Sequence, residues 1–267
     1  MESSPSTGFF YSLHYTVRWT DMLNLALGLI FVYFTTSIWE TFVHWKICHA
    51  NKNTRLAWKR YGGIFNLLRK AYFLHNTIHH VKTYSSNYYV QFDSLNKKES
   101  LDSKLYSRPH LRVLRDRYGL SISGFWGNAV FMAIPISIAI SIFSLLAIKH
   151  VWFAILIAIV PMVLSKYLHP FLHEENPISK STSTIMKHFL NSRYFLYIQL
   201  YHYIHHRYPL CNFNLMLGGD YLLGVARTLT PKPINNPGPI NLEDYRITKP
   251  FSGRAKGTRR WWLPLRV

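Results

Sequence analysis

A run of 31 residues without any Asp, Glu, Lys or Arg, at positions 118–148, constrains the fold of this chain more than any other feature. Two shorter uncharged runs, of 18 and 15 residues, occupy positions 22–39 and 151–165. A bilayer core about 30 Å thick is crossed by roughly 20 apolar residues in a helix. The runs therefore predict an all-α fold, an integral membrane helical bundle with three spans. We place these spans at about residues 22–43, 125–148 and 151–168.

The alternative is that the runs are buried helices of a soluble protein. We favour the membrane, because three such runs are hard to bury inside a chain of 267 residues. Pro135 and Pro161 lie inside the predicted spans, and a membrane helix tolerates proline better than a soluble helix does.

Basic residues indicate the orientation, because Lys and Arg stay on the cytoplasmic side of a membrane. Positions 46–117 hold 15 Lys and Arg against 4 acidic residues, whereas the first 20 positions hold one basic residue, Arg18. We therefore expect the N-terminus outside and residues 44–117 inside. The turn at Lys149 should again be outside, and everything after residue 166 inside.

We divide the chain into a membrane-embedded domain, residues 1–228, and a basic tail, residues 229–267, rich in Pro, Arg and Trp. In the domain we expect residues 55–82 to form one helix on the membrane surface, 85–109 to be irregular and 183–206 to be helical. Regular structure should stop after Thr230. The net charge of +19 favours an anionic partner, either nucleic acid or lipid. We favour lipid, because predicted spans already place the chain beside it, and expect no nucleic-acid partner.

Ten of the 14 histidines fall into four clusters, far more often than chance would place them there. The clusters follow the patterns H-x4-H, H-x3-HH, H-x3-H and H-x2-HH. Neutral imidazole is the commonest side-chain metal ligand, so we interpret the clusters as metal-binding. The candidate ligands are His44, His49, His75, His79, His80, His169, His173, His202, His205 and His206.

The spacing within the clusters predicts how the rings point. Residues three or four apart on a helix face the same way and can aim two imidazoles at one point. The first cluster fits less well, because residues five apart lie about 140° apart on a regular helix. We expect the helix to break between His44 and His49, or the two to serve different ions. The other expected pairs are His75 with His79, His169 with His173, and His202 with either His205 or His206.

Topology predicts that the clusters can converge. Two membrane crossings separate the second cluster from the third, and an even number of crossings returns the chain to the same face. All four clusters therefore end on the inside, in a helical cap at the cytoplasmic face.

Ten ligands are too many for one ion and suit two ions with about five nitrogens each. Structural zinc prefers four ligands, often Cys, and the chain has only two cysteines. We expect two iron ions, because an enzyme that reacts with oxygen would need a redox metal. Zinc can nevertheless replace iron in such a site during purification. Glu174 and Glu175, next to the third cluster, remain open as ligands, hydrogen-bond acceptors or surface charges.

For the other polar residues near the clusters we favour a role outside metal binding. His14, His110, His150 and His188 stand outside the clusters, and His188 alone lies close enough in sequence to support a ligand. For Asn212 and Asn214 we slightly favour a turn after the last cluster over a role in the site.

The order of the four clusters around the apolar runs resembles the fatty acid hydroxylase/sterol desaturase superfamily. The likeness covers about residues 40–224 and is most specific in LYHYIHHRYPLCNFNLMLGGDYLLG, at 200–224. The second cluster has three residues between its first two histidines, where fatty acid 2-hydroxylases have two.

This resemblance implies a membrane di-iron oxygenase that uses O2 and two external electrons to insert one oxygen atom into a lipid C–H bond. It assigns the ten clustered histidines as iron ligands. It also implies a separate electron donor, such as a cytochrome b5-like protein, a ferredoxin or a reductase, since the chain shows no fused cytochrome b5 segment. The active site would lie on the cytoplasmic face of a bacterial inner membrane or the endoplasmic reticulum.

Two alternatives remain open. A lipid desaturase or sterol-type oxidase would share the metal site and differ in how the substrate C–H bonds sit. A metal-binding membrane protein without catalysis, such as a carrier, is the weaker alternative, because a carrier should place ligands inside its spans and the three runs hold no His.

Overall fold

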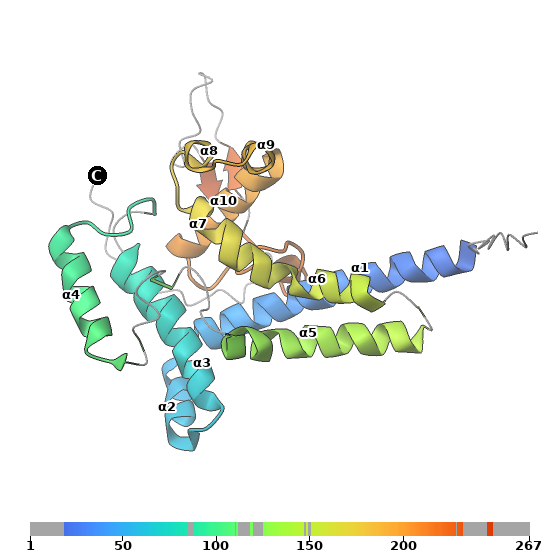
Figure 1. Ribbon diagram of the computed structural model, residues 1–267, viewed down its shortest axis with the longest axis horizontal. Helices are drawn as coiled ribbons and strands as arrows, with labels where there is room; N and C mark the ends of the chain where they lie inside the picture. Colours follow the sequence, from blue (N-terminus) through green and yellow to red (C-terminus); the bar gives the residue numbers. More distant parts are fainter. Residues whose placement is uncertain are drawn as a thin grey trace, which may run out of the picture.

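The computed structural model of the chain describes residues 19–84, 88–109, 111, 118–119, 125–146, 148, 151–227, 229–231 and 245–247. Within these ranges the chain is helical, apart from one pair of short strands (Figure 1). Three long helices lie side by side at one end of the molecule, and shorter helices gather at the other end. The helical fold class is therefore confirmed for this part of the chain.

The elements follow one another in this order. The α-helices are α1 (Trp19–Val43), α2 (Lys52–Tyr61), α3 (Phe65–Tyr72), α4 (Leu95–Tyr106), α5 (Phe125–Leu145), α6 (Val151–Val163), α7 (His169–Leu172), α8 (Pro177–Lys180), α9 (Thr184–Leu190), α10 (Arg193–Arg207) and α11 (Gly219–Leu222). The π-helices are η1 (His44–Cys48), η2 (Phe73–Thr83) and η4 (Leu164–Leu168). The strands are β1 (Leu229–Pro231) and β2 (Tyr245–Ile247), which pair antiparallel.

Two helices in the described ranges are long and apolar enough to cross a membrane. They are Trp19–Cys48, which joins α1 to η1, and Val151–Leu172, which joins α6, η4 and α7. They match the first and third predicted spans and point to membrane association. The middle prediction is met only in part, because the apolar segment with described side chains on α5, Phe131–Leu145, is shorter than a span.

The long helices pack through small side chains and present large apolar ones outward. Ala139, Ala154 and Ala158 are fully buried where α5 and α6 meet their neighbours, which lets the helix backbones approach closely. Leu27 and Phe31 on α1 are more than half exposed. An exposed apolar surface of this kind suits lipid better than water.

Residues 55–82, predicted as a single helix, form α2, α3 and η2 instead. Gly62 and Gly63 separate α2 from α3, with φ of 62° and 56°. Glycine adopts this left-handed backbone without steric cost, and it ends helices for that reason. The single-helix prediction followed the mixture of basic and aromatic residues and passed over the two glycines.

Two segments that we expected to lack regular structure contain some. Within residues 85–109 the chain forms α4, where the Ser94 hydroxyl accepts from the Lys97 N–H at 3.3 Å and so caps the helix. Leu101 and Leu105 are buried in one apolar cluster with Leu74 and Ile78 of η2, and this packing stabilises α4. In the tail, β1 pairs with β2 from Leu229 onward. The prediction for residues 183–206 is confirmed, as α9 and α10.

Candidate metal centre

All ten clustered histidines meet where the C-terminal ends of α1 and α6 approach η2 and α10. They come from η1 and the residue after it, from η2, from α7 and the residue after it, and from α10. Six of the rings are buried and four are half-buried. The structure thus brings together every histidine that the sequence clusters, including pairs more than 150 positions apart, such as His49 and His205.

The ten rings divide into two groups. In the first group, the ligand nitrogens of five rings all lie within 4.8 Å of one another. In the second group the same holds for four rings, those of His44, His49, His75 and His205. His80 joins the second group, because its Nε2 lies 3.0 Å from that of His75 and 3.1 Å from that of His205. The first group is His79, His169, His173, His202 and His206, and the second is His44, His49, His75, His80 and His205.

The nitrogen separations suit ligands of a shared ion. Neighbouring Nε2 atoms lie 3.0 Å apart for His79 and His206, and 2.9 Å apart for His169 and His202. Two nitrogens that each bind an ion at ~2.1 Å are ~3.0 Å apart when they meet at a right angle. Lone pairs aimed at one another repel unless a cation or a proton lies between them. The donor set is therefore compatible with metal binding.

A π-helical turn explains how the first cluster works. In η1 the His49 N–H donates to the His44 carbonyl at 3.0 Å, so residues five apart stand beside each other. Their rings stack with centroids 5.4 Å apart, and both belong to the second group. The expected break in the helix is not found, because α1 continues into this π-helical turn, and both rings belong to one group rather than to two.

The same geometry corrects one predicted pair. In η2, His75 lies 3.0 Å from His80 between Nε2 atoms, whereas His79 belongs to the other group. The prediction of His75 with His79 assumed 3.6 residues per turn and was wrong because η2 is wound more loosely. The pair His169 with His173 is found, and His202 shares its group with His206 rather than His205.

Backbone carbonyls orient several rings from behind. The Nδ1 of His205 lies 2.9 Å from the Cys211 carbonyl, and that of His173 lies 2.8 Å from the Tyr88 carbonyl. His44 makes the same kind of contact with the Phe213 carbonyl. A carbonyl accepts only from a protonated nitrogen, so these contacts place the proton on Nδ1 and leave the Nε2 lone pair facing the group.

Burial keeps the rings neutral. It lowers the pKa of His79, His202 and His205 well below 6.5, and repulsion from neighbouring imidazoles lowers it further. A neutral imidazole offers a lone pair, whereas a protonated one does not. These rings are therefore in the form that binds a metal at neutral pH.

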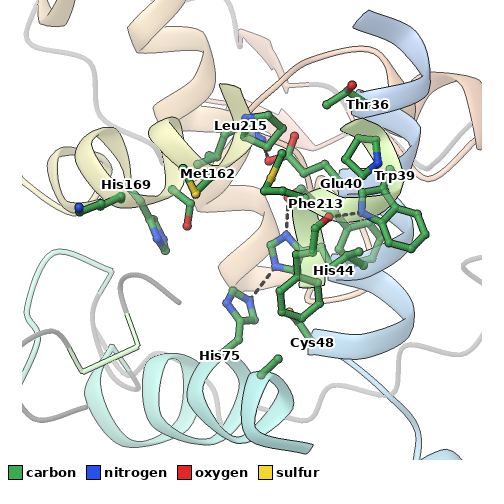
Figure 2. A pocket seen from close by; sticks show the side chains of 18 of the residues that line it. Thr36, Trp39, Glu40, His44, Cys48, His75, Met162, His169, Phe213 and Leu215 are labelled. Atoms are coloured by element: carbon green, nitrogen blue, oxygen red, sulfur yellow. Dashed lines mark hydrogen bonds between the residues drawn. The ribbon is translucent and has the colours of Figure 1, made fainter. Parts of the chain in front are cut away.

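An apolar pocket of about 140 Å³ opens beside the rings (Figure 2). Its wall includes His44, His75 and His169, and Figure 2 shows His44 joined to His75 by a hydrogen-bond line. The rest of the wall comes mainly from apolar side chains of the three long helices, among them Trp39, Val43, Phe131, Pro135, Ala158 and Met162. The pocket thus leads from the rings into the space between α1, α5 and α6.

A buried polar network fixes the loop of residues 211–216, which supplies the Cys211 and Phe213 carbonyls behind His205 and His44. Asp220 is fully buried and accepts from the Tyr201 and Thr41 hydroxyls at 2.8 and 2.9 Å and from the Asn214 N–H at 2.9 Å. Burial raises the pKa of Asp220 to about 6, although these donors hold it down. Glu40 accepts from the backbone N–H groups of residues 215 and 216, both at 3.0 Å.

The roles of Glu40 and Asp220 were not predicted from the sequence. The GGD sequence at 218–220 was the available signal, since an acidic residue directly after a turn in an apolar stretch needs a buried partner.

Tyr201→Phe tests the network. The change removes one donor from a buried carboxylate, so we expect the free energy of unfolding to fall by about 1–3 kcal/mol. Thermal unfolding in detergent measures the loss. Tyr203→Phe is the matched control, because Tyr203 is half-buried on the same helix and its ring contacts Tyr88 instead. Equal unfolding midpoints in both variants would argue against a supporting role for the Asp220 contact.

The remaining candidates stand outside the two groups of rings. Glu174 pairs with Lys180 at 3.7 Å, and His188 is exposed on α9. Neither these residues nor Glu175 belongs to the two groups of rings. His14, His110 and His150 lie outside the described residues.

The two asparagines after the last cluster bind backbone rather than the rings. Asn212 has a φ of 53° and donates to the Arg227 carbonyl at 2.9 Å. Asn214 donates to the Ser37 carbonyl and so ties the loop to α1. The positive φ of Asn212 fits the predicted turn, whereas Asn214 helps to hold the loop whose carbonyls orient His44 and His205.

No protein-family model matches the sequence, and neither a curated protein nor a solved structure matches it.

Proposed function

We propose that this protein is a membrane di-iron oxygenase of the fatty acid hydroxylase/sterol desaturase type, which hydroxylates a C–H bond of a lipid. One observation carries the proposal: two groups of five imidazoles adjoin an apolar pocket that leads between the long helices. A ligand set of this size exceeds the four ligands of structural zinc and suits redox ions.

The two groups of rings would hold the ions, one each. Iron held there supplies the capacity to activate O2 with two electrons from outside. The contribution of the chain is to position the rings, because carbonyls behind His44, His173 and His205 keep each Nε2 turned inward. The same contacts hold the Nδ1 protons in place while the reaction proceeds.

The pocket would select and orient the substrate. Its apolar wall favours a hydrocarbon tail and excludes water. A tail that enters between α1, α5 and α6 comes directly from the bilayer, where such a substrate is most concentrated. Of the C–H bonds along the tail, only those that reach the rings at His44, His75 and His169 can react.

The rings would lie on the cytoplasmic face, since the segment between the first two predicted spans carries the excess of Lys and Arg. A separate donor, cytochrome b5-like, ferredoxin or reductase, would deliver the electrons from that side.

Lipid mass spectrometry tests the proposed function. Cells that express the chain should accumulate a lipid heavier by one oxygen atom, and the product should disappear without O2. Protein purified anaerobically with iron should hold about two metal ions per chain. Loss of two hydrogen atoms in place of oxygen gain would indicate a desaturase on the same site. An unchanged lipid profile with two metals bound would refute the oxygenase.

A further inference from the structure

A second cleft, of about 810 Å³, lies on the opposite side of α3 from the apolar pocket. It lies between α2, α3 and two residues of the segment after α4, Arg108 and Leu111. Its described lining contains six cationic side chains and no Asp or Glu. The cations are Lys52, Arg55, Lys59, Arg69, Lys70 and Arg108.

The helix between the two cavities separates them. Ala71, Leu74 and His75 face the apolar pocket. Arg69, Lys70 and Phe73 face the basic cleft, as residues three and four apart do on one side of a helix. A single lipid with its tail in the pocket could not place its headgroup here without bending around α3. The cleft is therefore a separate site.

Arg55 is poised for an anion. Its Nε is buried and has no hydrogen-bond partner among the described residues. Its guanidinium stacks on Tyr72 at 4.5 Å, and the Tyr72 hydroxyl accepts from Asn76 at 2.8 Å, so the ring beneath it is anchored. A buried donor without an acceptor is costly, and an anionic ligand would satisfy it.

The size of the cleft favours a small ligand over a protein. A volume of about 810 Å³ is typical of a small-molecule site, whereas proteins meet over broad, flatter surfaces of about 800 Å² each. Leu67, Phe73 and Leu111 add apolar surface to the lining. Arginine forks match phosphate oxygens in pairs, which makes phosphate the best fit for this set of cations.

We propose that this basic cleft between α2, α3 and the segment after α4 binds a phosphate-bearing small molecule. The phosphate belongs either to a lipid headgroup at the membrane surface or to a soluble compound, and both offer the same chemistry to Arg55 and Arg69. Binding here needs neither metal nor substrate, so the proposal stands apart from the oxygenase function.

Calorimetric titration of the detergent-solubilised full chain with inorganic pyrophosphate tests the cleft. We expect saturable binding, weakened about tenfold by Arg69→Gln and about tenfold by Arg55→Gln. Arg69 is exposed, so its variant should fold normally. Arg60→Gln is the matched control, because Arg60 is exposed on α2 but does not line the cleft. Its affinity should equal that of the wild type.

Lipid nanodiscs distinguish the two sources. Pyrophosphate is titrated into protein in discs of phosphatidylcholine and in discs that also contain phosphatidic acid. Weaker binding in the second discs identifies a lipid headgroup as occupant, and equal binding identifies a soluble phosphate. Either result supports the cleft, provided that Arg69→Gln reduces binding in phosphatidylcholine. Absence of pyrophosphate binding, equal loss in Arg60→Gln, or binding only of an acidic protein overturns the proposal.

Discussion

His79→Ala is expected to leave about one metal ion per chain where the wild type holds two, and to abolish the hydroxylated product. His79 is fully buried, and its Nε2 lies 3.0 Å from that of His206 within the first group. Loss of a residue that merely supports a ligand already costs 10–100-fold in metal affinity or activity, so loss of a ligand should cost more than about 100-fold. Elemental analysis and lipid mass spectrometry measure the two effects.

His205→Ala should remove the ion of the other group. Its Nε2 lies 3.1 Å from that of His80 and 3.2 Å from that of His49, so it stands at the centre of the second group. Each single variant should retain one ion, and the double variant none. His188→Ala is the control, because His188 is exposed on α9. Two ions per chain and full activity in either single variant would defeat the assignment of the rings.

Gly219→Ala is expected to destabilise the protein by about 3 kcal/mol, which lowers the unfolding midpoint by roughly 10 °C. A Cβ at Gly219 would lie 2.3 Å from the Ser37 carbonyl oxygen and 2.7 Å from the Ile38 nitrogen. Both are backbone atoms of α1, so neither can turn aside as a flexible side chain would. The steric clash is relieved only if α11 moves away from α1.

Gly63→Ala is the matched control for this clash. Gly63 has a φ of 56°, and a Cβ there would meet nothing within 4 Å. The substitution should therefore cost only the left-handed backbone strain of about 1–2 kcal/mol. A Gly219→Ala variant no less stable than Gly63→Ala would show that α11 and α1 are not held at this distance.

The contact at Gly219 also matters for the metal site. Asp220 follows it directly and anchors the loop whose carbonyls orient His44 and His205. A displaced α11 would carry these carbonyls with it. Gly219→Ala should therefore lose metal from the second group before the first, which sequential metal analysis during mild heating would detect.

Much of the helical fold could be predicted, because periodicity and capping act over a few residues. Two of three expected spans match long apolar helices, and residues 183–206 are helical as expected. The errors have local causes as well. Gly62 and Gly63 divide a predicted helix, and Ser94 starts one in a segment read as irregular.

The amino-acid sequence by itself determined which ten side chains could form a metal site, because the four histidine clusters are visible without any coordinates. Only the tertiary structure decided how they divide between two groups. That division depends on π-helical turns that set His75 beside His80, and on the contact of α11 with α1 that positions the carbonyls behind His44 and His205. The basic cleft likewise exists only once the turn at Gly62 and Gly63 brings α2 against α3. Spacing along a chain predicts which way neighbours point, whereas packing between distant segments decides which groups meet.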